Sequence, residues 1–345
     1  MNVNERIRIF VKFGQNLSGY IASGFPLHFE DAFFQSQITN PWFTQENILL
    51  CLKNWSTLLT AENLEKWVEP YKKDIDESSP KKIAVIMAGN IPLVGFHDFL
   101  CVLFSGNSFI GKLSSQDKFL LPAICRELET IEPSLKVSIN LTEDRISGFE
   151  AVIATGSENT SNYFNYYFGK YPHIIRKNRN SVAILTGDET KKDLELLADD
   201  VFLYFGLGCR NVTKVYLPQA YNFDMMREAF MKYDSMIMQH NKYVNNYDYH
   251  KSIMLINKIP FLDFGLIMLK EEGQFSSPIS VLHYEYYNEI ADVLQEIDES
   301  KEKIQCVVAN EKYSGFTIPF GKSQSPELWD YADGMDTLKF LVSLR

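Results

Sequence analysis

The sequence has 345 residues, of which 46% are hydrophobic and 23% are charged, and its net charge is −10 at pH 7. This composition is typical of a globular protein, and the length suits two domains. An acidic chain lacks the basic field that steers proteins to nucleic acid or anionic lipid, so we expect no nucleic-acid partner. Phosphate-bearing ligands stay compatible, because backbone N–H groups can bind them locally.

The cysteines and the apolar stretches indicate a compartment. Five cysteines, an odd count without C-x-x-C spacing, predict neither a disulfide framework nor a metal site. The apolar stretches 91–104 and 252–269 are too short or are interrupted by charges and proline, so we expect no insertion into a membrane. The N-terminus is polar and lacks a signal-peptide core. We therefore expect a cytoplasmic protein.

Along the chain, residues 1 to about 73 predict helices and loops, and the polar, proline-marked stretch 74–81 predicts a junction. An alternation of strands and helices follows. Strands are predicted at 82–87, 108–113, 136–141, 151–155 and 181–185, and helices at 93–105, 118–131 and 161–168. This alternation predicts a mostly parallel α/β sheet with helices on both faces and with ligand-binding loops at the carboxyl ends of its strands.

A second α/β domain is predicted from about Gly206. A long helix from Lys191 leads to the glycine-rich segment, a strand follows at 213–217, and a helix is expected at 222–239. Strands and loops continue to about residue 308. We expect boundaries that divide the chain into residues 1–205, 206–320 and 321–345, with the last segment returning to the first domain or to a neighbour.

The strongest local motif is Gly206-Leu207-Gly208-Cys209. Two glycines let the backbone turn tightly and expose the residue that follows, and Arg210 would favour a thiolate. The alternative is a buried structural cysteine, which the apolar surroundings of the other four cysteines suggest for them. Cys209 fits that alternative poorly, because a glycine loop before the polar pair Arg210-Asn211 is an unfavourable core environment.

Three weaker motifs each admit two interpretations. Asn90, between the first strand and a helix, is either a helix N-cap or an amide donor to an oxyanion. Lys112, at the end of the second strand, either binds a ribose or phosphate or is simply solvated. The turn Thr155-Gly156-Ser157 either holds a pyrophosphate or only begins a helix. A G-x-G-x-x-G fingerprint is absent from the sequence.

The order of these motifs resembles that of the aldehyde dehydrogenase superfamily. The succession is G-N-I-P-L at 89–93, G-K-L-S-S at 111–115, T-G-S at 155–157, G-L-G-C at 206–209 and P-F-G at 319–321. The closer resemblance is to the fatty acyl-CoA reductases of the bacterial bioluminescence type, which the C-terminal string 326–334 also resembles.

This resemblance implies a Rossmann-type nucleotide-binding domain, preceded by the helical region, and a second α/β domain that carries the catalytic cysteine. It implies that Cys209 is the nucleophile and that Asn90 donates to the oxyanion. Lys112 would contact the adenosine ribose or its 2′-phosphate. The T-G-S turn at 155–157 would lie along the cofactor diphosphate.

Two departures from the superfamily pattern are informative. Hydrolytic members carry a Glu-Leu-Gly-Gly element, whereas this chain has 175–181 there, with Arg176 about where the glutamate should fall. Because that glutamate activates water, its absence favours acyl-CoA chemistry. Ser115 replaces the acidic residue that holds the ribose hydroxyls in NAD-preferring members. Together with Lys112 and Ser114 it leaves room for a 2′-phosphate, so we expect NADPH.

The sequence thus predicts NADPH-dependent reduction of an acyl-CoA, of fatty acyl type, to an aldehyde. Two alternatives stay open: a cysteine-dependent acyltransferase or thioesterase without hydride transfer, and a non-catalytic subunit that binds acyl groups or nucleotide. The expected partners are the acyl-CoA substrate and either further copies of the chain or an acyl-activating protein.

Overall fold

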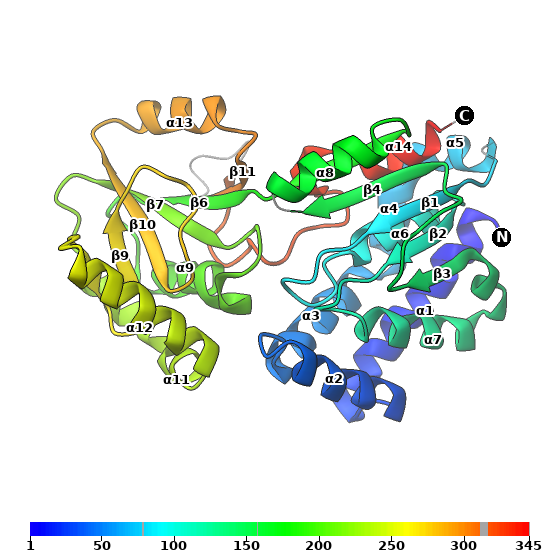
Figure 1. Cartoon of the computed structure of the whole chain (residues 1–345), viewed down its shortest axis with the longest axis horizontal. Coiled ribbons are helices and arrows are strands. Elements are labelled where there is room, and N and C mark those ends of the chain that lie inside the picture. Colours follow the sequence, from blue (N-terminus) through cyan, green and yellow to red (C-terminus); the bar gives the residue numbers. More distant parts are fainter. Residues whose placement is uncertain (78, 157, 311–316, 345) are drawn as a thin grey trace. The chain divides into compact units, whose positions relative to one another are not determined.

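The computed structural model describes residues 1–77, 79–156, 158–310 and 317–344. The chain divides into two compact units, one formed by Met1–Asn178 with Glu327–Arg345 and the other by Arg179–Pro326. Each unit contains one sheet and its own helices (Figure 1). The fold is therefore α/β, which confirms the predicted fold class.

Helices dominate the N-terminal part of the first unit. They are α1 (Val3–Ser23), α2 (Leu27–Thr39), α3 (Gln45–Leu58), α4 (Ala61–Val68) and α5 (Lys72–Glu77). In α1 the buried positions include Val3, Ile7, Phe10 and Leu17, a spacing that places them on one face of a helix. A capping box between Asn2 and Glu5 begins this helix. The apolar face of α1 packs against α3 and α7 (Leu120–Ile131).

The first sheet has five parallel strands in the order β3-β2-β1-β4-β5. They are β1 (Lys82–Ile86), β2 (Ser108–Lys112), β3 (Ile139–Thr142), β4 (Ala151–Gly156) and β5 (His173–Lys177). The middle residues of β1 and β4 are apolar and fully buried, as expected for a sheet covered on both faces. Helix α6 (Phe96–Phe104) connects β1 to β2, and α8 (Glu158–Phe168) connects β4 to β5 and packs on both (Figure 1).

The C-terminal segment completes the first unit through a buried ion pair. The Arg176 guanidinium in β5 donates from Nη1 to both carboxylate oxygens of Asp98 in α6, at 2.9 and 2.7 Å. Its Nη2 donates to Thr337 Oγ1 at 2.7 Å, at the start of α14 (Thr337–Val342). Arg176 and Asp98 are only 4% and 7% exposed. One buried cation therefore joins a strand, a helix and the end of the chain.

The second unit is built on a seven-stranded sheet in the order β12-β11-β6-β7-β10-β9-β8. Its strands are β6 (Asn180–Ile184), β7 (Val212–Pro218), β8 (Leu262–Asp263), β9 (Met268–Glu271), β10 (Val281–Tyr287), β11 (Ile304–Val308) and β12 (Thr317–Ile318). Its helices are α9 (Lys191–Phe202), α10 (Asp224–Phe230), α11 (Asp234–Met238), α12 (Asn241–Ile256) and α13 (Ile290–Glu299). Val182, Tyr216 and Ile297, from β6, β7 and α13, belong to one buried apolar cluster.

The division into units differs from the predicted boundaries. The predicted change at residue 206 lies inside the second unit, because β6 pairs with β7 and β11 and so belongs to the second sheet. The segment that lies in the first unit at the C-terminus begins at Glu327 instead of residue 321. The predicted helix 222–239 is divided between α10 and α11, and β5 was not predicted at all.

The ion pair supports a stability prediction. Asp98→Asn removes the charge that compensates Arg176, so we expect the free energy of unfolding to fall by about 3–5 kcal/mol in urea titrations followed by circular dichroism. Glu143→Gln is the control, because it breaks the more exposed pair with Lys118 and should cost less than about 1 kcal/mol. Equal losses in both variants would contradict the stabilising role of the buried pair.

Candidate active site

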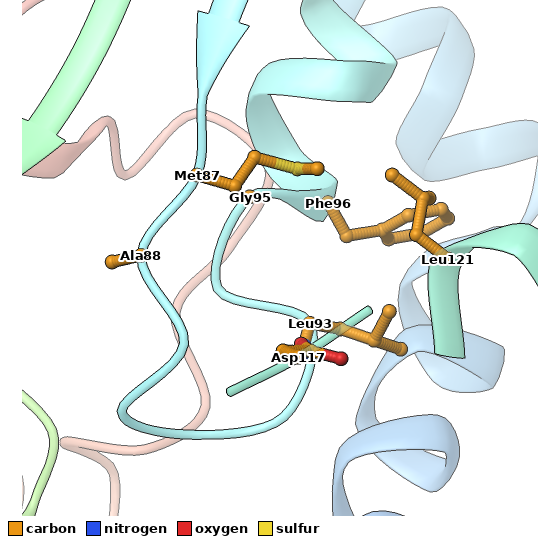
Figure 2. A pocket seen from close by; sticks show the side chains of 7 residues that line it. All are labelled: Met87, Ala88, Leu93, Gly95, Phe96, Asp117 and Leu121. Carbon is orange, nitrogen blue, oxygen red and sulfur yellow. The ribbon is translucent and has the colours of Figure 1, made fainter. Parts of the chain in front are cut away.

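Asn90 lies in the loop between β1 and α6. Helix α6 begins at Phe96 and its N-cap is Gly95, so the interpretation of Asn90 as a helix cap is wrong. Its side chain is exposed. Figure 2 shows this loop passing around a small pocket, with the side chains of Leu93 and Asp117 next to each other. The role of Asn90 as an amide donor stays a prediction.

Lys112 ends β2 beside the end of β1. Its partner in the parallel register is Ile86 of β1. The half-buried Lys112 side chain donates from Nζ to the backbone oxygen of Glu143 at 2.6 Å, whereas the Glu143 carboxylate is bound by Lys118 at 2.9 Å. The contacts described for the Lys112 ammonium thus include no carboxylate, and a ligand phosphate would meet little competition there.

Ser114 and Ser115 continue the segment after β2. Ser114 is half-buried, and its Oγ accepts a hydrogen bond from Gln116 N at 3.2 Å. Ser115 is exposed. A Cβ on Gly89 would lie 2.5 Å from Ser114 Oγ, so the loop after β1 contacts this segment where only glycine fits.

The T-G-S turn stands at the end of β4. Thr155 and Gly156 are half-buried, and Ser157 lies outside the described residues. A Cβ on Gly156 would lie 3.0 Å from atoms of Thr160 and Phe164, which explains the small residue where β4 meets α8. Ala154 pairs with Ile86 of β1, so the end of β4 adjoins the end of β1 on the side opposite β2.

The register of this sheet brings the predicted residues of the first unit to one edge. Because the strand order runs 3-2-1-4-5, the chain reverses direction across the sheet between β1 and β4. The carboxyl ends of strands at such a switch point are where open α/β sheets bind ligands. Asn90, Lys112, Thr155 and Gly156 all lie at or just beyond these carboxyl ends.

Cys209 belongs to the second unit and follows a strained turn. Tyr204, Phe205 and Gly206 have φ values of 53°, 58° and 75°, so three consecutive residues adopt the left-handed conformation. This conformation costs roughly 1–2 kcal/mol for each residue with a side chain. Cys209 is exposed, whereas Cys51, Cys101 and Cys125 are buried and Cys306 is intermediate. All five cysteines lie in the described residues, so Cys209 has the most accessible thiol.

The Asn211 side chain stabilises this turn. Its Nδ2 donates to the backbone oxygens of Asp200, Val201 and Leu203 at 3.1, 3.4 and 2.9 Å. Its Oδ1 accepts from Gly208 N at 2.8 Å. Asn211 is fully buried, so the expectation that the Arg-Asn pair marks a poor core environment was wrong for its second residue. The polar group is tolerated because its amide is fully hydrogen-bonded.

Asp200 connects this turn to the P-F-G turn. Its carboxylate accepts hydrogen bonds from Gly321 N at 2.7 Å and Ser323 N at 2.9 Å, and the side chain is almost fully buried. Burial raises the pKa of Asp200 to about 6, while the bonds from the two backbone amides oppose this rise. The motifs at 206–209 and 319–321 are therefore joined within the second unit through Asn211 and Asp200.

A serine at the start of β6 contacts Cys209. Ser181 Oγ donates to the backbone oxygen of Cys209 at 3.0 Å and lies 3.0 Å from Cys306 Sγ. The pairings of β6 with both neighbouring strands are irregular near Ser181. Burial raises the pKa of Cys306 to about 11, although Arg210 lowers it. Cys306 is therefore a neutral thiol near neutral pH, which makes it a poor nucleophile.

Several of these residues were missed by the sequence predictions. Asp117, Ser181 and Asp200 stood in segments predicted only as loop, strand or helix, and their contacts come from residues far away along the chain. Asn211 stood beside the predicted nucleophile but had no assigned role. A polar residue that directly follows a glycine-rich turn is the one local signal that could have identified it.

Two other kinds of site were searched for in the described part of the chain. No group of three or more histidine, cysteine or acidic side chains lies together there in a way that could hold a metal ion. Within the same residues, no helix has both the length and the apolar character needed to cross a bilayer.

Solved aldehyde dehydrogenases share this fold. The Mycobacterium tuberculosis enzyme complexed with NAD+ is 11% identical with a TM-score of 0.62, over 94% of this chain and 75% of that one. Aldehyde dehydrogenase 21 from Physcomitrella patens, complexed with its product succinate, is 13% identical with a TM-score of 0.59, over 90% and 73%. An indole-3-acetaldehyde dehydrogenase complexed with NAD+ is 11% identical with a TM-score of 0.60, over 94% and 74%. The fold is thus of the aldehyde dehydrogenase type, as predicted.

The family follows from the sequence. The family model described as "Acyl-CoA reductase (LuxC)" matches residues 29–232, which is more than half of the chain. No curated protein matches the sequence. The chain belongs to the LuxC acyl-CoA reductase family, which confirms the predicted resemblance and places it among the oxidoreductases. The match covers Asn90, Lys112 and Cys209.

The buried amide supports a second prediction. Asn211→Ala leaves three carbonyl oxygens and the Gly208 amide without this partner, so we expect a loss of about 2–4 kcal/mol in the free energy of unfolding. Urea titration measures it. Asn246→Ala is the matched control, because the Asn246 side chain makes an exposed bond within α12 and its loss should be nearly neutral. If the two variants unfold alike, Asn211 does not hold the turn.

Proposed function

We propose that this chain reduces an acyl-CoA thioester, of fatty acyl type, to the aldehyde with NADPH through an acyl group on Cys209. The observation that carries the proposal is the exposed thiol of Cys209 after a strained turn, in a member of an acyl-CoA reductase family. Strain at a residue beside a reactive group is typical of functional sites, because the surrounding contacts must maintain it.

The first chemical step is assigned to the Cys209 thiolate. Its sulfur attacks the thioester carbonyl, a new carbon–sulfur bond forms, and the carbonyl electrons move to the oxygen. When they return, the bond to the CoA sulfur breaks and CoA leaves as a thiolate, which needs little acid assistance. Arg210, next in the chain and half-buried, supplies positive charge that favours the thiolate form of Cys209.

The developing oxyanion is assigned two donors, the Asn90 side-chain amide and the Cys209 backbone N–H. Each donor would be strongest when the carbonyl oxygen carries negative charge, which is the condition for accelerating the reaction. Removal of one such donor typically costs about 10²–10³ in rate. In support of this role, Asn90 is exposed and is not used as a helix cap.

The residues at the edge of the first sheet fit a nicotinamide dinucleotide phosphate. Lys112 has its ammonium near the surface, Ser114 and Ser115 carry hydroxyls, and the Glu143 carboxylate is occupied by Lys118. Thr155 and Gly156, with Ser157 by sequence, would lie along the diphosphate. When bound, the reduced nicotinamide supplies a hydride to the acyl carbon. The chain's part is then to stabilise the oxygen and release the aldehyde from Cys209 as its thiolate re-forms.

Exclusion of hydrolysis is assigned to Arg176. Where hydrolytic relatives of the superfamily carry a water-activating glutamate, this chain has a guanidinium that is buried and bound to Asp98. It cannot accept a proton from water, because an arginine stays charged. An acyl group on Cys209 would therefore persist until it is reduced or returned to CoA.

The test follows the decrease in NADPH absorbance with acyl-CoAs of several chain lengths. We expect oxidation that depends on acyl-CoA in the wild type, at least about 10³-fold slower turnover in Cys209→Ala, and a loss of about 10²–10³ in Asn90→Ala. Cys125→Ala, which removes a buried thiol on α7, should retain the activity. A wild type without such oxidation would refute the proposal.

The alternatives give different outcomes in the same assay. With NADPH withheld, the proposed enzyme should release a single equivalent of CoA and then stop, because nothing removes the acyl group. Continued release of CoA without NADPH would identify a thioesterase or acyltransferase. Unchanged behaviour in Cys209→Ser, with nucleotide still bound, would identify a non-catalytic binding subunit.

Cofactor preference gives a separate prediction. Ser115→Glu would place a carboxylate where a 2′-phosphate is expected, so we expect KM for NADPH to rise by about 10–100-fold with little change for NADH. Ser115→Gln, which has the same size without the charge, is the control and should raise it by only a few-fold. Equal effects on both cofactors in steady-state kinetics would show that Ser115 does not face a 2′-phosphate.

A further inference from the structure

The loop between β1 and α6, residues 87–95, is held by side chains from three other segments. Asn40 Nδ2, after α2, donates to Gly89 O at 3.3 Å. Cys51 Sγ, in α3, donates to Pro92 O at 3.3 Å. Asp117 Oδ2, in the segment after β2, accepts from Leu93 N at 2.7 Å, the shortest of the three bonds. Side chains from outside the loop thus help to fix the backbone that carries Asn90.

Leu93 is the strained residue of this loop. Its φ is 57°, in the left-handed region, which costs a leucine roughly 1–2 kcal/mol. A hydrogen bond contributes about 0.5–1.5 kcal/mol, or about 1.5–3 kcal/mol where one partner is charged, which is comparable to this strain. Without an acceptor at this position, Leu93 would be expected to return to a favourable φ and to move the residues before it, Asn90 included.

The Asp117 carboxyl is unusual in its own surroundings. It is 8% exposed, and among the described residues its Oδ1 has no hydrogen-bond partner. Together with Met87, Leu93 and Phe96 it lines the small pocket of Figure 2. A buried carboxyl with one oxygen unsatisfied carries a desolvation cost that calls for a compensating role. The bond to the strained amide of Leu93 is the interaction that gives it one.

Asp117 also ends the segment that carries the proposed cofactor residues. Asp117 N donates to Ser114 O at 3.1 Å, closing a turn over Ser114, Ser115 and Gln116. This turn touches the loop after β1 directly, because a Cβ on Gly89 would lie 3.1 Å from Asp117 N. A displacement of the turn would therefore act on the loop through both the backbone and the carboxylate of Asp117.

We propose that Asp117 is a positioning residue that fixes the Asn90 loop to the segment 112–117, so that a nucleotide bound to this segment also orders the loop. The inference rests on the proposed function for the roles of Asn90 and Lys112. Asp117 is assigned no contact with substrate or cofactor and acts through its bond to Leu93. Its loss should therefore lower kcat more than it raises KM for NADPH.

The first test needs no turnover. Hydrogen–deuterium exchange, read on peptides that cover 88–95, should slow when NADPH is added to the wild type. In Asp117→Ala the same peptides should exchange at least about tenfold faster and lose most of the response to NADPH. Gln116→Ala, a change to an exposed side chain of the same turn, is the control and should behave like the wild type.

Kinetics provides the second readout. We expect Asp117→Ala to reduce kcat by about 10²-fold with KM for NADPH changed less than about threefold, as for a displaced oxyanion donor. Asp117→Asn should recover much of kcat, because its amide oxygen still accepts from Leu93 N. A purely structural carboxylate would give the same loss in both variants, or a loss in KM instead of kcat.

A pH dependence distinguishes the carboxyl from its amide replacement. Burial raises the pKa of Asp117 to about 7, although the bond from Leu93 N lowers it, whereas the unfolded chain has the ordinary value of 3.8. The protonated Asp117 carboxyl therefore contributes to the free energy of unfolding below about pH 4. This contribution is lost as the pH rises from about 4 to about 7. Cys51 is the titratable group whose charge interacts with that of Asp117. Burial raises the pKa of the Cys51 thiol, and the Asp117 charge raises it as well. Asp117→Asn should remove this part of the pH dependence.

The outcomes separate this inference from the function on which it rests. If NADPH leaves exchange at 88–95 unchanged in the wild type, or Asp117→Ala leaves it protected, the inference is overturned whatever the activity. If the loop behaves as expected but acyl-CoA causes no NADPH oxidation, the proposed function fails while the structural connection stands. The wild-type arm decides the matter even where Asp117→Ala does not fold.

Discussion

The parallel pairing of β1 with β2 on one side and β4 on the other is the constraint on which the first unit depends. Ile86 pairs with both Lys112 and Ala154, so β1 and β2 end at the same level and β4 continues two residues further, to Gly156. The chain must then leave the sheet three times at one edge, and the loops must pack on one another. Gly89 against Ser114 is the consequence, since a Cβ on Gly89 would lie only 2.5 Å from the Ser114 hydroxyl oxygen. Among the predicted site residues of this unit, such packing leaves Asn90 and Ser115 exposed and Lys112 half-buried.

Both units use a buried aspartate for the same physical purpose. Irregular loops leave backbone N–H groups that neither helix nor sheet can satisfy, and burial makes each unpaired group costly. Asp117 accepts the amide of Leu93, and Asp200 accepts those of Gly321 and Ser323. In each case burial raises the pKa of the carboxyl and the amide bonds oppose the rise. The irregular backbone next to the predicted motifs is therefore held by carboxyl groups that come from elsewhere in the fold.

Local patterns predicted the strands and the loops that follow them, because apolar runs and glycine turns are local properties. They could not predict Asp117, whose place in the polar run Ser-Ser-Gln-Asp-Lys is typical of a solvated loop. Its burial depends on the amide of Leu93, 24 residues earlier. β5 was missed for a related reason. From the sequence alone, Arg176 is typical of a surface residue. Its burial depends on contacts with Asp98 and Thr337, which lie 78 and 161 residues away along the chain. The roles of the site residues likewise stay predictions, since no local pattern measures reactivity.

The contacts of Arg176 with Asp98 and Thr337 link the proposed chemistry to the fold of the first unit. A water-activating carboxylate must be able to accept a proton, and a carboxylate cannot replace Arg176 without cost to the first unit. A carboxylate there would face Asp98 in a buried space, and two like charges at that distance repel strongly where water cannot screen them. Thr337 would also lose its donor, which loosens the C-terminal segment from β5. The arginine at position 176 is thus part of the packing of the folded first unit as a whole, and it cannot be exchanged for a carboxylate on its own.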